Sequence, residues 1–427
     1  MKNIKWACIQ PLTGGFYLGA ENAIGHPAEF ILSYPGLDSV KYDKEGNMSD
    51  VGNEYNLLKY LEKHDKLPIY KQFNRKTFDS SMDTNVELLD TDWKNGDKNI
   101  DMSDIDLVVS VPVCSGLSQA TIAGDDTKKS RNCNMVWNAK YALEVIKPKC
   151  YIFENAQAVF DATRADYVRE EIEELARRYG YSITYVKTDT LLHYNCQRRP
   201  RCFVCLFKGD SCPSIEYENK HINVKEFFDK IPTNATQQIT VDIKEDAQAY
   251  IDFLKYFYGD DWRHCLPKNG WTLGTIIKNN LFDDFLKFVD TGNYTDITKQ
   301  KINKFIDHVQ YKLSLGKNFY AMVPVVISPD DTKISACMFK SIPTLYHYEK
   351  DRLFTIREWL TTMGFPYDFE MYGDINRNYP KIGQNVPVKT SEWIVRECVN
   401  ALTDNCAEWY KTNVLYVNNI KQKTFEK

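Results

Sequence analysis

The sequence predicts an α/β fold built around a largely parallel sheet. Short apolar strands alternate with helical segments through the first 207 residues. DIDLVVSVPV (104–113) is a nearly continuous apolar run, which is typical of a strand that is buried on both faces. Strands that alternate with helices indicate βα units and parallel pairing.

The first elements follow this alternation. IKWACIQ (4–10) predicts a strand that runs into the loop PLTGG, and residues 16–24 predict a helix. EFILS (29–33) predicts a second strand. Residues 36–56 are rich in Asp, Gly, Asn and Ser, and we interpret them as a loop.

The alternation continues after the strand at 104–113. Residues 135–146 predict a helix and residues 149–156 a strand. Residues 166–181 predict the clearest helix, because apolar side chains recur at i, i+3 and i+4 opposite a charged face. Two more strands are predicted at 182–190 and 201–207.

The pattern loosens after about residue 208. Short helices are predicted at 224–231, 249–259 and 281–289, between less regular segments. Helices return at 355–363 and 390–402. We therefore predict two lobes, the first formed by residues 1–207 and 351–427 and the second by residues 208–350.

Length, charge and cysteine content exclude fewer classes of function than the sequence motifs do. The chain has 427 residues, which favours two or three units. Its formal net charge of −4 means that binding to a nucleic acid would need a locally basic cleft. The sequence contains neither a signal peptide nor a membrane-length apolar run, so we expect no membrane contact. Its 12 scattered cysteines indicate free thiols in a reducing cytoplasm. We also expect a monomer.

Three sets of polar residues lie at the ends of predicted strands: Cys114 and Glu154 follow strands, at the edge where α/β sheets place active sites, and the arginines precede one. Cys114 lies in the turn after 104–113, where a thiol can be exposed and activated or can simply be a small core residue. Glu154 follows the next strand, as an acid of raised pKa or as a solvated carboxylate. Arg199 and Arg201 could bind phosphate or carbonyl oxygens, but they could also belong to a basic turn without a functional role.

In their order, these segments resemble the DNA cytosine-5 methyltransferase family. A Gly-rich loop (11–25), the Cys turn, Glu-Asn after a strand and Gln-x-Arg-x-Arg (197–201) follow one another as they do in that family. RLFTIREWLTTMGFP (352–366) resembles its ninth motif, and IGQNVPVKTSEWIVRECVNAL (382–402) its tenth. The resemblance spans nearly the whole chain.

The resemblance implies a methyltransferase sheet, a smaller target-recognition domain at 208–350, and DNA as the partner. Cys114 would attack carbon 6 of a cytosine that has been flipped out of the duplex, Glu154 would act at N3, and Arg199 and Arg201 would lie near the cytosine and its phosphate. The methyl donor would be S-adenosyl-L-methionine. Ser118, Asn155 and Gln197 are the implied substrate-side residues. The cofactor side is implied to comprise Gln10, Thr13, Gly14, Gly15, Phe16, Tyr34, Pro112, Gln384, Asn385 and Val386.

Departures from the family pattern lie mostly on the cofactor side. Gln10 stands where the family has an aromatic residue, and no carboxylate follows the second strand until Asp38. Three alternatives remain open: a diverged site for ordinary S-adenosylmethionine, which we favour, an altered one-carbon donor, for which Lys389 is a candidate cation, and a DNA-binding relative without turnover. RNA as substrate is a further alternative. Restriction–modification and phage genome modification both fit.

Two further sets of residues are weaker candidates. Cys202 and Cys205 have CxxC spacing, but they fall within an apolar strand, so we predict no metal site. In the second lobe, Arg263, Lys268 and Trp271 are candidate DNA contacts.

Overall fold

The computed structural model describes residues 4–74, 82–112, 127–266, 271–316, 324–327, 333–334 and 345–426, with the side chains of 127–133 and Arg164 left out. Contacts divide the chain into two compact units. The sheet unit comprises Met1–His221, Thr362–Asp374 and Gln384–Lys427. The helical unit comprises Ile222–Thr361 and Ile375–Gly383. Their assignment as catalytic and target-recognition domains stays a prediction.

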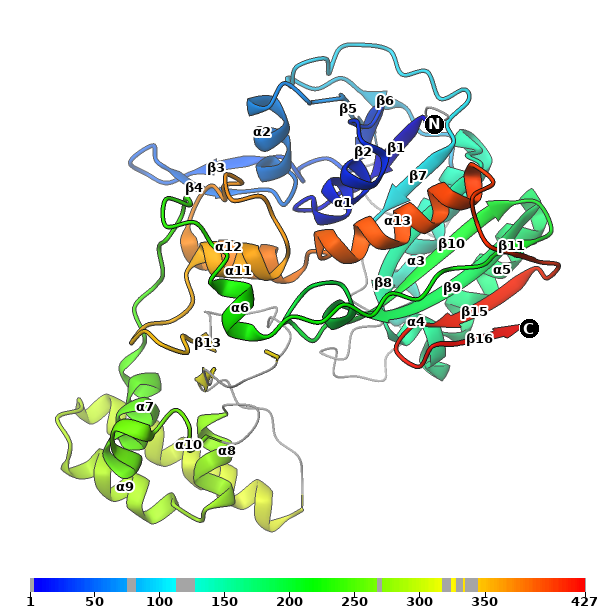
Figure 1. The fold of residues 1–427 in the computed structure, drawn as a ribbon. Helices are drawn as coiled ribbons and strands as arrows, with labels where there is room; N and C mark the ends of the chain where they lie inside the picture. Colours follow the sequence, from blue (N-terminus) through cyan, green and yellow to red (C-terminus); the bar gives the residue numbers. More distant parts are fainter. Residues whose placement is uncertain are drawn as a thin grey trace. The chain divides into compact units, whose positions relative to one another are not determined.

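A ten-stranded mixed sheet forms the centre of the sheet unit, in the order β16-β15-β9-β10-β8-β7-β1-β2-β5-β6 (Figure 1). Strands β8, β7, β1, β2 and β5 run parallel to one another, whereas β10 runs antiparallel between β8 and β9. The predicted mixed α/β fold is confirmed. The strands are β1 (Trp6–Ile9), β2 (Phe30–Ser33), β5 (Ile69–Phe73), β6 (Leu88–Leu89), β7 (Leu107–Ser110), β8 (Cys150–Ala156), β9 (Tyr181–Asp189), β10 (Pro200–Lys208), β15 (Val414–Asn418) and β16 (Lys423–Glu426).

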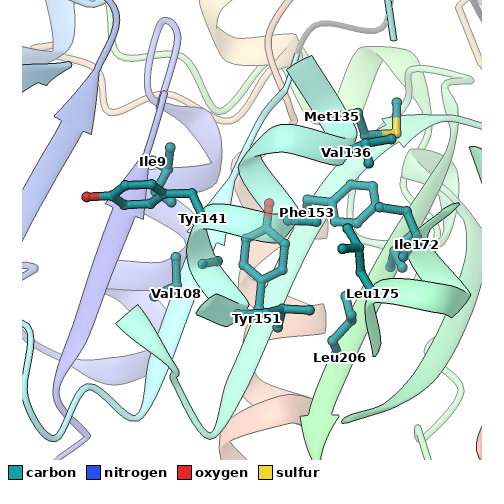
Figure 2. Close-up of a cluster of buried hydrophobic side chains, with 14 of the residues drawn as sticks. Ile9, Val108, Met135, Val136, Tyr141, Tyr151, Phe153, Ile172, Leu175 and Leu206 are labelled. Carbon is teal, nitrogen blue, oxygen red and sulfur yellow. The ribbon is translucent and has the colours of Figure 1, made fainter. Parts of the chain in front are cut away.

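Helices cover both faces of this sheet (Figure 1). On one face, α1 (Gly15–Ile24) packs against α13 (Val388–Leu402). On the other, α3 (Thr127–Tyr141) and α5 (Asp166–Tyr179) enclose the main core. Figure 2 shows Tyr151 and Phe153 of β8 within that core, beside Ile172 and Leu175 of α5. The apolar period of α5 explains this packing, because its buried residues are Val168, Ile172, Leu175 and Ala176.

The polar stretch after β2 is more regular than expected. Residues 36–56 contain the antiparallel pair β3 (Val40–Tyr42) and β4 (Met48–Val51), and α2 (Tyr55–Lys63) begins at its end. The prediction of a plain loop was therefore wrong. Asp43 makes the hairpin turn possible, since its carboxylate accepts from the amides of Glu45 and Asn47 at 3.0 and 2.8 Å.

The helical unit contains a small bundle with its own apolar core. Its helices are α6 (Val224–Phe228), α7 (Glu245–Tyr258), α8 (Thr272–Lys278), α9 (Phe282–Thr291), α10 (Asp296–Ser314), most of α11 (Ile356–Thr362) and α12 (Ile375–Gly383). Short strands also occur, namely β12 (Val325–Val326) and β13 (Leu345–Tyr346) here, and β11 (Cys212–Pro213) and β14 (Trp409–Tyr410) in the sheet unit. In the described ranges, we find no helix with the length and apolarity needed to cross a membrane.

The ninth motif begins α11 with a capping box. The Thr355 amide donates to Glu358 Oε2 at 2.8 Å, and the Glu358 amide donates to Thr355 Oγ1 at 3.1 Å. Arg352 holds the same carboxylate through two hydrogen bonds of 2.8 and 2.7 Å. Arg352 and His347 together hold the pKa of Glu358 at about 2 despite its burial. Arg352, Thr355 and Glu358 of this segment therefore have a structural role, because they fix the start of α11.

Candidate active site

Most of the predicted site residues lie along one edge of the sheet. The carboxyl ends of the parallel strands β1, β2, β7 and β8 meet there, and β10 begins there because it is antiparallel to β8. Gln10, Tyr34 and Pro112 follow β1, β2 and β7 directly or within two residues. Sheet topology therefore brings together residues that are up to about 190 positions apart in the chain.

Glu154 and Arg201 form an ion pair at this edge. Their strands are neighbours, with Arg201 opposite Ala156 and Phe203 opposite Glu154, so the two side chains are diagonal to one another. Arg201 Nε lies 2.6 Å from Glu154 Oε1. Burial raises the pKa of Glu154, although Arg201 and Arg199 act against that rise. Glu154 is therefore a buried acid whose proton persists to higher pH than that of a solvated glutamate.

Arg199 is almost fully buried beside this pair. Its amide donates to Asp189 Oδ1 at 3.0 Å, and the same oxygen accepts from the Leu191 amide at 3.2 Å. Asp189 thus fixes the turn that leads from β9 into β10. The Arg199 guanidinium donates from Nη2 to the main-chain carbonyl of Asn385 at 2.9 Å.

Asn155 and Gln197 occupy the space around these charges. Asn155 donates from Nδ2 to the carbonyl of Pro112 at 3.5 Å, two positions before Cys114. Gln197 is fully buried, and within the described ranges neither Nε2 nor Oε1 of its side chain has a hydrogen-bond partner. Cys114 and Ser118 lie outside the described residues. The chain nevertheless enters their segment at the edge that holds Glu154 and Arg201.

Gln10 and Tyr34 are joined through a residue that the sequence did not point to. Asn138 of α3 donates to Gln10 Oε1 at 3.3 Å and accepts from the Tyr34 hydroxyl at 3.0 Å. Gln10 has a φ of 54°, and its amide donates to the Leu32 carbonyl at 2.8 Å. This buried polar chain links the ends of β1 and β2. No motif signals Asn138, because it is one polar residue within a helix.

The glycine loop after β1 is packed against the tenth motif. The Gly15 amide donates to Asn385 Oδ1 at 2.9 Å. A Cβ atom on Gly15 would lie 1.9 Å from the carbonyl oxygen of Val386, and one on Gly14 would lie 2.6 Å from Leu57 Cδ1. Thr13 is also buried in this loop. The close approach of Asn385 and Val386 therefore explains why glycine is needed at position 15.

Asp38 lies near this edge, about five residues after the end of β2. Gln72, which pairs with Ser33 at the ends of β5 and β2, donates to Asp38 Oδ1 at 2.7 Å. Trp93 Nε1 donates to Asp38 Oδ2 at 2.9 Å. These two donors orient the carboxylate and leave it further acceptor capacity, since an ionised carboxylate has about four lone-pair sites. The turn after β2 explains how Asp38 reaches the edge.

Glu54, a second carboxylate near this edge, was also missed from the sequence. It is fully buried at the start of α2, and the Tyr70 hydroxyl donates to its Oε2 at 3.1 Å. Burial raises the pKa of Glu54 to about 8, although the Tyr70 hydroxyl acts against that rise. Tyr70 belongs to β5, so Glu54 connects the start of α2 to that strand.

Other predicted residues lie elsewhere. Phe16 is buried in the core, with its ring edge-on to Phe203 at 5.6 Å. Gln384 is exposed and accepts from Asn53 Nδ2 at 3.2 Å, so Asn385 rather than Gln384 reaches the glycine loop. Lys389 is exposed and pairs with Glu392 Oε2 at 2.8 Å.

The structure also shows where the weaker candidates Cys202, Cys205 and Arg263 lie and what they contact. Cys202 lies in the core beneath α5, whereas Cys205 is close to Cys398 of α13 on the other face of the sheet. Among the described residues, no group of three or more His, Cys, Asp or Glu side chains could hold a metal ion. Arg263 pairs with Asp351 at 2.8 Å and stacks on Trp262, and Lys268 lies outside the described residues.

Comparison with known structures shows the fold. The chain resembles a protein described as a DNA modification methyltransferase of an Escherichia coli prophage, at 17% identity and a TM-score of 0.51, over 94% of this chain and 99% of that one. It also matches the Entamoeba histolytica methyltransferase EhMeth (12% identity, TM-score 0.46, 95% and 99% covered). A third match is the Dnmt2 methyltransferase of S. pombe, at 14% identity and a TM-score of 0.43, over 94% of this chain and 99% of that one. The fold is that of the S-adenosylmethionine-dependent methyltransferases.

Comparison with protein families gives a more specific result. No curated protein sequence matches the chain. The family model of the C-5 cytosine-specific DNA methylases matches residues 70–400, which are 331 of the 427 residues. That match includes the segment of Cys114, the Glu154 strand, the paired arginines, residues 352–366 and residues 382–400 of the last segment. The chain therefore belongs to the C-5 cytosine-specific DNA methylase family.

Proposed function

We propose that the protein methylates carbon 5 of cytosine in DNA through a covalent bond between Cys114 and carbon 6 of a base that has left the duplex. The observation that carries this proposal is the buried Glu154–Arg201 pair beside the strand end from which the chain continues to Cys114. A buried acid next to a nucleophile is what addition to the cytosine ring requires. We also propose that the enzyme acts in the cytoplasm as a monomer.

The proposed reaction begins at the thiol. Addition of the Cys114 thiolate to carbon 6 forms an S–C bond and moves an electron pair toward N3. Glu154 gives its proton to N3, so that the ring does not carry a full negative charge. Arg201 and Arg199 then stabilise the carboxylate that remains. The raised pKa of Glu154 suits this role, because the acid form is the one that donates.

The second half of the reaction uses carbon 5. Addition at carbon 6 breaks the aromaticity and makes carbon 5 nucleophilic. S-adenosylmethionine, when bound, would supply the electrophilic methyl group and leave as S-adenosylhomocysteine. Once carbon 5 carries the methyl group, loss of its proton to a base expels the Cys114 thiolate, and return of the N3 proton to the Glu154 carboxylate restores neutral cytosine. Extrusion of the base costs roughly a few kcal/mol of lost stacking and pairing.

The edge of the sheet fits the donor in its chemistry. We propose that Asp38 accepts from the ribose hydroxyls, because its carboxylate is oriented at the edge by Gln72 and Trp93. Tyr34 and the Gln10–Asn138 pair would lie against the adenosyl group. The loop of Thr13, Gly14 and Gly15, held by Asn385, would contact the methionine end. The pairing of Lys389 with Glu392 gives no support to a donor that carries an extra carboxylate.

Trapping on DNA that contains 5-fluorocytosine tests this proposal. Fluorine at carbon 5 cannot leave as a proton does, so we expect the methylated adduct to persist on denaturing gels. Cys114→Ser abolishes the adduct in this proposal, whereas Cys265→Ser, at an exposed cysteine, leaves it intact. Mass analysis of the product nucleoside identifies the transferred group. An adduct that survives Cys114→Ser contradicts the proposed nucleophile, and no adduct at all favours a DNA-binding relative without turnover.

The biological setting is a further part of the proposal. Restriction–modification and phage genome modification both use a cytosine mark that is set on DNA. We expect DNA from cells that express the protein to gain resistance to restriction enzymes that are blocked by 5-methylcytosine. Cells that express the Cys114→Ser variant provide the control.

A further inference from the structure

Tyr194 has an unusual backbone conformation in the turn between β9 and β10. Its φ is 53°, in the left-handed region that bulky side chains rarely adopt. The side chain is 54% exposed, although His193, Asn195, Cys196 and Gln197 around it are all buried. An exposed tyrosine thus occupies a position where glycine or asparagine would be less strained.

The turn is held firmly on both sides of Tyr194. The Tyr194 amide donates to the Lys220 carbonyl at 2.9 Å, and the Lys220 amide donates to the Leu192 carbonyl at 2.9 Å. The preceding His193 is bonded to Glu218 Oε2 at 2.8 Å and to Thr188 Oγ1 at 2.7 Å. The conformation of Tyr194 is therefore imposed by an ordered segment.

Packing does not explain the tyrosine side chain. Within the described residues, its ring pairs with no other aromatic ring and its hydroxyl makes no hydrogen bond. Its neighbour is Lys220, whose Nζ lies 6.0 Å from the ring centroid. Within the described residues, the ring therefore has no aromatic or hydrogen-bond partner that would account for its exposed position.

The position of this turn points to the partner. Pro200 is opposite Asp189 and Arg201 is opposite Ala156, so the turn lies at the edge that holds Glu154. Arg198 in the same turn is also exposed. Lys220 is half-exposed and pairs with the mostly buried Glu218 at 2.7 Å, which holds its ammonium group near the Tyr194 ring. Aromatic rings interleaved with cations are typical of surfaces that stack on bases and neutralise phosphates.

We propose that Tyr194 is a DNA-contact residue whose ring stacks on a base left exposed when the target cytosine is extruded, with Lys220 on a neighbouring phosphate. This inference rests on the proposed function, because it needs a DNA substrate at this edge. Stacking on an aromatic ring recovers part of the stacking that extrusion removes. It also gives a reason for the strained backbone, since the strain places the ring outward.

Two substitutions at position 194 separate the ring from the backbone. Tyr194→Asn tolerates the left-handed conformation but lacks the ring, and Tyr194→Phe keeps the ring. The readout is the concentration of random-sequence duplex containing 5-fluorocytosine that gives half-maximal adduct. We expect this concentration to rise about tenfold for Tyr194→Asn and to change less than about twofold for Tyr194→Phe. The adduct formed at saturating DNA should be unchanged.

Further measurements exclude a merely structural effect. The midpoint of thermal unfolding of Tyr194→Asn should equal or exceed that of the wild type, because strain is relieved. Tyr42→Ala, at another exposed tyrosine, should leave the half-maximal concentration unchanged. Lys220→Gln should lower the slope of log affinity against log salt concentration by about one.

The outcomes distinguish this inference from the proposed function. If the wild type forms the adduct and Tyr194→Asn needs no more DNA than the wild type, the inference is wrong and the proposed function stands. If Tyr194→Phe is as impaired as Tyr194→Asn, the ring is not what binds, and the inference is also wrong. If the wild type forms no adduct, the proposed function fails, and the inference fails with it.

Discussion

Arg199 and Asn385 are joined by a buried hydrogen bond of 2.9 Å, from guanidinium Nη2 to main-chain carbonyl. Asn385 also accepts, through its side chain, from the amide of Gly15 at 2.9 Å. One residue of the tenth motif therefore connects the arginine beside Glu154 with the loop proposed to hold the donor. The two halves of the candidate site are mechanically linked through it.

This link predicts the effect of Asn385→Ala. The Gly15 amide would be left buried without an acceptor, which costs about 1–3 kcal/mol in the free energy of unfolding. We also expect weaker binding of S-adenosylmethionine, measured by calorimetry, because the glycine loop loses its support. Gln384→Ala is the control, since this neighbour is exposed and should change stability by less than about 0.5 kcal/mol. Equal effects of the two substitutions would contradict the link.

The close packing at Gly15 predicts a larger effect for Gly15→Ala. The new methyl group would lie 1.9 Å from the Val386 carbonyl, so α1 and the tenth motif must separate. We expect a loss of more than about 3 kcal/mol in denaturant unfolding. Gly46→Ala is the matched control, because its Cβ enters open space and only its φ of 85° is unfavourable, at about 1–2 kcal/mol. A smaller loss at Gly15 than at Gly46 would show that this contact is not tight.

The environment of Glu154 predicts both a rate and a pH effect. Glu154→Gln keeps the shape but cannot protonate N3, so kcat should fall by about 100-fold or more. Because burial raises the pKa of Glu154, the wild type should lose activity on a basic limb as this carboxyl ionises. The variant should lack that limb in its profile of kcat against pH. Glu174→Gln, on the exposed face of α5, is the control, and a variant that keeps a tenth of the activity would exclude Glu154 as the acid.

The sequence predicted those parts of the site that follow from strand order. Glu154 was expected at the edge of the Cys114 turn because both follow apolar strands, whereas Arg201 was placed near the cytosine by the family resemblance, and the pairing of β8 with β10 explains its contact with Glu154. Asn138 and Glu54 were not predicted, because a single polar residue in a helix or a loop carries no periodic signal. Asp38 was noted as the first carboxylate after β2 but was not assigned to the cofactor side, since its contact with Gln72 depends on tertiary structure.

The fold shows the same difference between local and non-local information. Strands β1, β2, β7, β8, β9 and β10 were predicted within a few residues, because buried strands are apolar runs. The hairpin of β3 and β4 was taken for a loop, since its strands are only three and four residues long and lie within a stretch rich in Asp, Gly, Asn and Ser. The pair of β15 and β16 was missed, although β15 (VLYVN) is an apolar run; β16 (KTFE) is polar and exposed, and only its pairing with β15 defines it.

Buried Glu54 predicts how stability depends on pH. Its pKa is about 8 in the folded protein, above the value of about 4.3 expected in the unfolded chain. Between these values the folded state binds more protons, so the free energy of unfolding should fall as the pH rises, by at most about 1.4 kcal/mol per pH unit. Above the folded pKa the contribution becomes constant.

Glu54→Gln isolates this contribution, because glutamine keeps the acceptor oxygen for the Tyr70 hydroxyl without titrating. The variant should gain stability relative to the wild type as the pH rises from 5 toward 8, in urea unfolding at several pH values. Glu45→Gln, on the exposed β3–β4 hairpin, serves as the control and should follow the wild type. A difference between Glu54→Gln and the wild type that does not change with pH would mean that Glu54 is already ionised in the folded protein at pH 5.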